Sequence, residues 1–244
     1  VLSGYPMGAK IVGDLVDDGT LSCARGREVL SYSLVTGPAF LMGTIGTFLG
    51  STRAALIIML AHYLGALLNG GFFRGNGRGR DRNSDRARGG GRTKATGAHF
   101  AAECGAVPAA SASSVLENFT LAITSGFKAM AVILAYLMIF MIGIDLAEAA
   151  GIWTHFGSEL TVSFLKGILE MTVGANMISL CNASLAFKTV LIATIVSFGG
   201  LSVIGQSVSM AAGSGIRLAD ILQIKLMHGI FSGLVAMFLV RMML

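Results

Sequence analysis

Long runs without charged residues constrain this chain more than any other feature. Residues 54–73, 129–144 and 231–240 contain no Asp, Glu, Lys or Arg. A helix needs roughly 20 apolar residues to cross the hydrocarbon core of a bilayer. Charged residues make up 13% of the chain, about half of the ~25% found in soluble domains. The sequence therefore predicts an all-α, multi-pass transmembrane helix bundle whose main partner is the lipid bilayer. Because the chain starts at Val1, we expect it to be a piece of a longer protein.

A basic, glycine-rich segment separates two apolar halves. Residues 74–94 contain seven arginines and one lysine against two aspartates, a composition that cannot bury enough apolar surface to fold. We expect residues 74–113 to form a disordered loop. Arg-Gly tracts also bind single-stranded nucleic acid. The position between two spans favours a cytoplasmic loop that obeys the positive-inside rule, so nucleic acid is not an expected partner.

The two halves resemble each other in the order of their elements. Gly8 and Gly174 are 166 residues apart, as are His62 and His228, and Gly37 lies 162 residues before Gly199. We predict a first repeat over residues 1–73. Residues 114–244 should form an interfacial helix, one span and a second repeat. Internal repeats, often inverted, are typical of transporter folds.

Each half also has a predicted helix break. Thr36-Gly37-Pro38 interrupts the first half and Phe198-Gly199-Gly200 the second, because proline removes a backbone donor and glycine adds backbone freedom. Freed backbone groups within a bilayer must face protein, water or a ligand. Packing glycines or simple kinks are the alternative. Paired breaks favour discontinuous helices around a midplane site.

Polar residues within the apolar segments define the candidate site. Glu170 stands out, because a carboxylate at membrane depth is costly and usually functional. We expect it to bind a solute or a coupling cation. The complete candidate set for substrate binding is Gly4, Pro6, Gly8, Lys10, Thr36, Gly37, Pro38, Glu170, Gly174, Asn176, Ser197, Gly199, Gly200, Ser202 and Gln206.

Structural interpretations compete for several of these residues. Lys10 and Asp14 are spaced to pair on one helix face, and Lys166 has the same spacing from Glu170. For His62 and His228, a proton relay is one interpretation. Hydrogen bonding across a helix interface is the one we favour.

Several of these motifs resemble a known family. The segments that carry the resemblance are residues 3–10 (SGYPMGAK), 36–38 (TGP), the Gly167-x-x-Glu170-x-x-x-Gly174 pattern and residues 197–203 (SFGGLSV). Together they are similar to the YlbJ-type sporulation integral membrane proteins, within the wider Gate or nucleoside-recognition group. The resemblance covers all but residues 74–113. It implies a multi-pass protein of the bacterial cytoplasmic or forespore membrane, needed in sporulation and suspected of transport.

The leading functional hypothesis is a secondary-transporter-like protein with a small polar solute or ion bound between the two repeats. The alternative is a non-transporting scaffold for spore envelope or cortex assembly. An enzyme is not expected, because the sequence has no metal motif, nucleophile elbow or phosphate loop. We expect no cofactor and no metal site. A homodimer is left open.

Overall fold

All regular secondary structure in the described residues is helical, which confirms the predicted class. The structure is a computed structural model that describes residue 4 and residues 6–77 and 115–244. Most of the predicted basic loop, residues 78–113, lies outside this part of the chain. The last helix of the first half was predicted to end at residue 73, but it continues to Gly77, into the start of the predicted loop.

The first half consists of short helices followed by one long one. Ser22 caps the second of these helices, as its position predicts, because its side chain accepts a hydrogen bond from the Arg25 N–H at 3.2 Å. The helices are α1 (Met7–Asp17), α2 (Cys23–Ser33), the π-helical turn η1 (Phe40–Ile45), α3 (Gly46–Leu49) and α4 (Thr52–Gly77).

The second half begins with a long helix, continues with several shorter helices and ends with another long one. Its elements are α7 (Val115–Ala149), η2 (Ile152–Phe156), α8 (Glu159–Leu169), α9 (Met171–Leu180), α10 (Leu185–Phe198), α11 (Gly200–Met210) and α12 (Leu218–Met243). Ser158, Glu170 and Ser184 cap α8, α9 and α10 with their side chains.

Four helical stretches in the described residues are long and apolar enough to cross a membrane. They are Thr52–Arg74, Phe119–Ala149, Leu185–Met210 and Leu218–Met243. Their outward faces carry large apolar side chains, which suits contact with lipid tails. The chain is therefore a multi-pass membrane protein.

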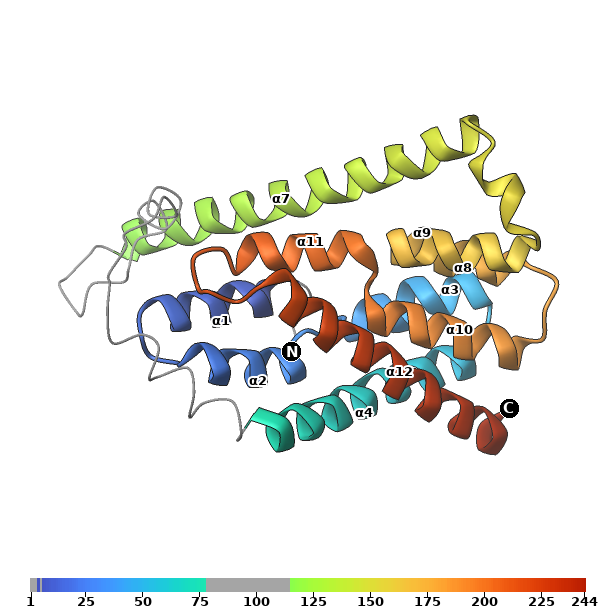
Figure 1. Cartoon of the computed structure of the whole chain (residues 1–244), viewed down its shortest axis with the longest axis horizontal. Helices are drawn as coiled ribbons and strands as arrows, with labels where there is room; N and C mark the ends of the chain where they lie inside the picture. Colours follow the sequence, from blue (N-terminus) through green and yellow to red (C-terminus); the bar gives the residue numbers. More distant parts are fainter. Residues whose placement is uncertain (1–3, 5, 78–114) are drawn as a thin grey trace.

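Both predicted breaks separate consecutive helices. Residues 34–37 are non-helical and separate α2 from the helical turn that leads into η1, because Pro38 disfavours helix in the residue before it. Gly199 and Gly200 both have positive φ, 85° and 73°, a conformation that glycine adopts at little cost. Figure 1 shows α2 followed by α3 and α10 followed by α11 along the long axis, in opposite directions. The two-repeat arrangement itself stays a prediction.

Helices α4 and α12 cross at very short range near the centre of the bundle. A side chain at Gly65 would come within 2.9 Å of the Ser232 backbone nitrogen. Small residues allow such an approach between membrane helices. Because of this crossing, His62 of α4 and His228 of α12 lie with their ring centroids 4.7 Å apart.

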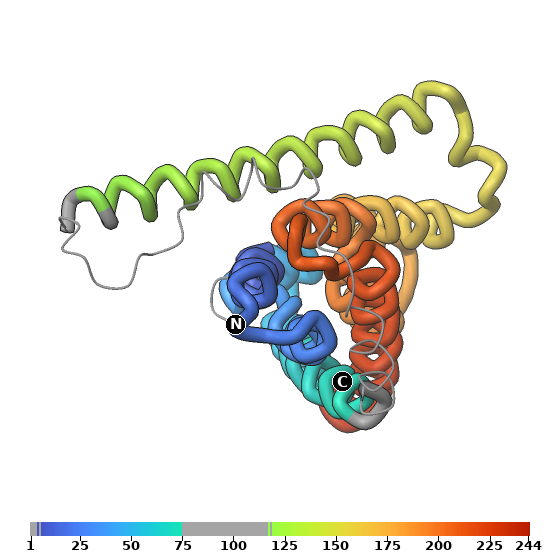
Figure 2. Tube along the Cα trace, turned by 60° about the vertical axis from the view of Figure 1, so that its left-hand side comes forward, coloured from blue at the N-terminus to red at the C-terminus, as the bar shows by residue number. Residues whose placement is uncertain are grey.

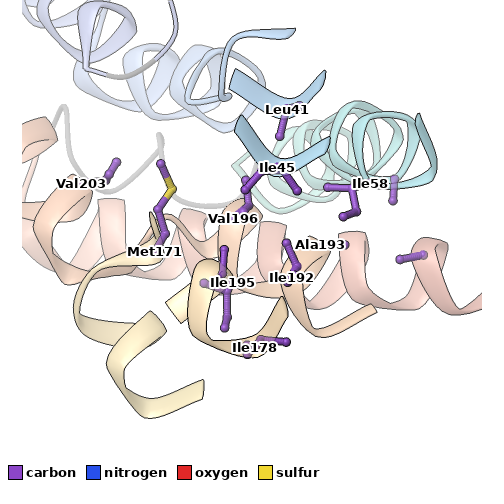
Figure 3. Packing of buried hydrophobic residues seen from close by; sticks show 13 residues of the cluster. Leu41, Ile45, Ile58, Met171, Ile178, Ile192, Ala193, Ile195, Val196 and Val203 are labelled. Carbon is purple, nitrogen blue, oxygen red and sulfur yellow. The ribbon is translucent and has the colours of Figure 1, made fainter. Parts of the chain in front are cut away.

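Two apolar clusters hold the remaining helices around this crossing. The first joins η1, α4, α9 and α10 through buried residues that include Leu41, Ile58, Ile178, Ile192 and Ile195 (Figure 3). The second joins α1, α2, α11 and α12; its buried members are Ala9, Val12, Leu30, Leu34, Ile204, Ala211, Ile216, Ile221 and Ile224.

Helix α7 is one continuous helix, where we expected an interfacial helix followed by a separate span. It stands apart from the bundle along much of its length (Figure 2). Near its middle the Tyr136 hydroxyl lies 2.7 Å from Ser209 Oγ on α11, and Gly205 leaves room for the Tyr136 ring. At its C-terminal end Glu148 pairs with Lys166 of α8.

The α4–α12 crossing yields a direct test. Gly65→Val should lower thermal stability in detergent by about 1–3 kcal/mol, the usual cost of overpacking, because the Ser232 backbone must move. Gly71→Val is the matched control. It lies on the same helix, nothing surrounds its Cβ position within 4 Å, and the change in helix propensity is the same. Equal melting temperatures for the two variants would contradict the close crossing.

Candidate functional site

The candidate site lies where the two helix breaks meet beside the α4–α12 crossing. We call it the central polar cluster, and it comprises Thr36, His62, Tyr63, Ser197, Lys225 and His228. Five of these side chains are buried, with Tyr63 partly buried. They come from the break after α2, from α4, from the end of α10 and from α12.

His62 joins the two breaks directly. Its Nε2 accepts a hydrogen bond from the Thr36 backbone N–H at 2.8 Å, and its Nδ1 lies 2.8 Å from Ser197 Oγ. A ring nitrogen that accepts a bond carries no proton. The neutral ring is therefore protonated at Nδ1, which donates to Ser197. One side chain thus meets a backbone group freed by the first break and a hydroxyl beside the second.

Further bonds fix the positions of His62 and of the first break. Tyr63 donates from its hydroxyl to the Thr36 carbonyl at 3.0 Å. His228 Nε2 lies 2.9 Å from the His62 carbonyl and must donate, since a carbonyl only accepts. The interpretation that both histidines hydrogen-bond across helix interfaces is confirmed.

Lys225 is the residue that our reading of the sequence missed. It is fully buried on α12, and its Nζ donates to the Leu34 carbonyl at 3.1 Å. The signal was present, because Ile224-Lys225-Leu226 places a charged residue in an apolar span. The rule that singled out Glu170 applies to Lys225 as well.

Glu170 forms the tip between α8 and α9. Its extended backbone (φ −138°, ψ 114°) separates the two helices, and its carboxylate accepts from the Val173 N–H at 2.8 Å as the cap of α9. The side chain is 2% exposed. Lys166 is directed elsewhere: it pairs with Glu148 and lies 5.3 Å from the Trp153 ring centre.

The Glu170 tip touches the second break. A side chain at Gly200 would meet the Leu169 carbonyl and the Met171 nitrogen, each at 3.1 Å. In the first half, a side chain at Gly4 would come within 3.3 Å of the Gly37 nitrogen. Each break is therefore in contact with the segment that precedes α1 or α9.

The other predicted residues fall into two groups. Ser202 and Gln206 are buried on α11 and bonded to each other at 3.2 Å, and Gly8 and Gly174 allow close helix packing against Ser33 and Gly167. Pro6 is buried at the start of α1 and Pro38 is half-buried before η1. The structure does not bring Lys10 or Asn176 to this site. Lys10 pairs with the exposed Asp14 at 2.9 Å, and Asn176 is exposed on α9.

Several buried polar atoms at or near the breaks have no hydrogen-bond partner among the residues that the structure describes. They include Thr36 Oγ1, Ser33 Oγ and Asn69 Oδ1. The Asn69 amide donates to the carbonyls of Ser31 and Ile224, both at 3.2 Å, and so ties α4 to α2 and α12. Buried polar atoms are usually satisfied, which makes these oxygens candidates for contact with a polar ligand.

Comparison with known proteins agrees with an integral membrane protein. The chain is 23% identical to the sporulation integral membrane protein YlbJ of Bacillus subtilis, in an alignment that covers 97% of the chain. The chain is a relative of that protein. It spans 61% of the relative's length. No protein-family model matches the chain, and no solved structure matches it. The resemblance expected from the sequence is confirmed for the YlbJ protein; membership of the Gate group stays a prediction.

The role of His62 can be tested by substitution. His62→Ala leaves the Thr36 N–H buried without an acceptor, which should cost about 1–3 kcal/mol of stability. His62→Gln, which keeps an acceptor, should recover part of that loss. The exposed His155 provides the control, and His155→Ala should stay within about 0.5 kcal/mol of wild type. Thermal melts in detergent measure all three, and a neutral His62→Ala would contradict the bridging role.

Proposed function

We propose that the chain is a sporulation-associated protein of the bacterial cytoplasmic or forespore membrane that binds and moves a small polar solute. The proposal rests on one observation above all: His62 connects the break of the first half to the break of the second, at Thr36 and Ser197. Discontinuous helices that meet inside the membrane are the usual framework of a transporter site.

The relative supports the sporulation part of the proposal. Its name places it in a membrane and in sporulation, and the described residues of this chain contain four stretches able to cross a membrane. The opposite directions of α2–α3 and α10–α11 in Figure 1 support the inverted repeat on which alternating access would depend.

Within this proposal the solute binds beside the contact between the second break and the Glu170 tip. Glu170 is buried, and the backbone of Gly200 packs against the backbone on either side of it. Ser202 and Gln206 supply further polar groups on α11. Thr36 supplies a hydroxyl from the first half.

A non-transporting scaffold for spore envelope assembly is the competing function. One observation favours it: Glu170 already caps α9, which is a structural role sufficient to retain a carboxylate. A scaffold would tolerate Glu170→Gln and Gln206→Ala in a sporulation assay, whereas changes in its surface loops would not be tolerated.

Flux through the reconstituted protein distinguishes the two functions. Proteoliposomes would be tested for uptake of nucleosides, metal ions and small anions. We expect at least one class to accumulate, and Glu170→Gln to reduce that uptake by tenfold or more, since a lost charged hydrogen bond is worth about 1.5–3 kcal/mol.

Glu159→Gln is the matched control, because Glu159 is exposed at the other end of α8. It should leave uptake unchanged. Absence of flux for every class, or full flux in Glu170→Gln, would overturn the assignment.

A further inference from the structure

Lys225 is a buried cationic residue in the middle of the bundle. Its side chain is completely buried on α12, between apolar neighbours in the sequence. Ionisable residues inside membrane segments are expensive to bury and mark ion pathways and proton relays more often than simple packing positions. The groups that contact the Lys225 amine therefore bear on its role.

The amine lies at the C-terminal end of a broken helix. Lys225 Nζ donates to the carbonyl of Leu34, the residue that caps α2. The last carbonyls of a helix have no partner within the helix and carry partial negative charge. The first break therefore presents an electronegative end to the ammonium group.

The C-terminal end of the second broken helix lies beside the same side chain. Gly199 caps α10, and a Cβ placed on it would lie 3.3 Å from Lys225 Cε. The ends of α2 and α10 thus converge on Lys225 from the two halves of the chain. Helix ends and unwound carbonyls of this kind are where transporters coordinate Na⁺ or a proton.

We propose that the Lys225 ammonium group occupies the position of a bound cation between the two helix breaks, and that its amine takes up and releases the coupling proton. An ammonium is a compact charge with three donors, suited to a set of carbonyl oxygens. Release converts the ammonium to a neutral amine and gives one proton to water; uptake reverses this, and no other bond changes. The coupling role depends on the transport function proposed above, whereas the occupancy of the cation position does not.

The titratable groups near Lys225 are held in hydrogen bonds of their own, so we assign the uptake and release of the proton to the Lys225 amine. His62 from α4 and His228 from α12 are near enough to interact electrostatically with it, and both are engaged through the hydrogen bonds described above. The Tyr63 hydroxyl from α4 is bonded to Thr36, and α11 carries no titratable residue.

Charged residues on the other packed helices have partners elsewhere. Arg25 pairs with Glu28 within α2, and Arg27 pairs with Asp220 at the start of α12. Lys188 of α10 donates to the Ser179 carbonyl. This arrangement assigns the coupling proton to Lys225 and leaves Glu170 to the solute.

Removal of the amine should create a site for an added cation. Purified Lys225→Ala would be melted in choline chloride, sodium chloride and methylammonium chloride. We expect a loss of several degrees in choline and recovery of at least half of that loss with sodium or methylammonium, in a saturable manner. If Lys225→Ala melts in choline at the wild-type temperature, or melts at the same temperature in all three salts, the proposal is overturned.

Lys188→Ala is the matched control. Its amine also donates to a carbonyl in the last turn of a helix, at 2.8 Å from Ser179 O, but away from the breaks. Its melting temperature should not depend on which of the three cations is present. A cation response as large as that of Lys225→Ala would mean that any lost lysine produces the effect, and would overturn the proposal.

The wild-type protein provides a second measurement that needs no variant to fold. Sodium should not stabilise it relative to choline at the acidic end of a pH series, where the ammonium fills the position. Sodium should stabilise it at the alkaline end of the series, once the amine has released its proton. An identical sodium response at both ends of the series would overturn the assignment. Neither experiment depends on transport. A protein that transports nothing would overturn the proposed function, whereas the assignment of Lys225 to a cation position would still stand on these melting experiments.

Discussion

The structure depends on the need to satisfy backbone groups that a broken helix leaves open inside a bilayer. A helix that stops in mid-membrane exposes N–H and C=O groups that lipid cannot bond. Here side chains from neighbouring spans meet them: His62 accepts from Thr36 N–H, Tyr63 donates to Thr36 O, and Lys225 donates to Leu34 O. The close approach of α4 and α12 at Gly65 and Ser232 brings these side chains to the break. The hydrogen bonds that satisfy the broken helix therefore depend on the close packing of small residues between α4 and α12.

Features that depend on local chemistry were predictable from the sequence. Apolar runs gave the membrane class and the approximate spans, because burial in lipid demands long stretches without charge. Gly37-Pro38 and Gly199-Gly200 marked the places where helices stop, because proline and positive-φ glycine act on their own backbone. The cap at Ser22 was predictable for the same reason.

Features that depend on the direction of a helix face were not predictable. Lys10 and Asn176 belong to the predicted site, yet α1 and α9 direct them away from the central polar cluster. Lys166 finds Glu148 on another helix instead of Glu170 one turn away. Lys225 and Leu34, 191 residues apart, are brought together only by tertiary packing. Spacing along a helix predicts which residues share a face, but it does not predict which other helix packs against that face.

Helix α7 is held by few contacts with the bundle and has 35 residues. At 1.5 Å per residue it is about 52 Å long, far more than the roughly 30 Å of a hydrocarbon core. Its apolar stretch, Phe119–Ala149, is also longer than a perpendicular span requires. Such a helix meets the mismatch by tilting or by thickening the bilayer around it. The contacts of Tyr136 with α11 and of Glu148 with α8 then fix where a tilted α7 meets the bundle.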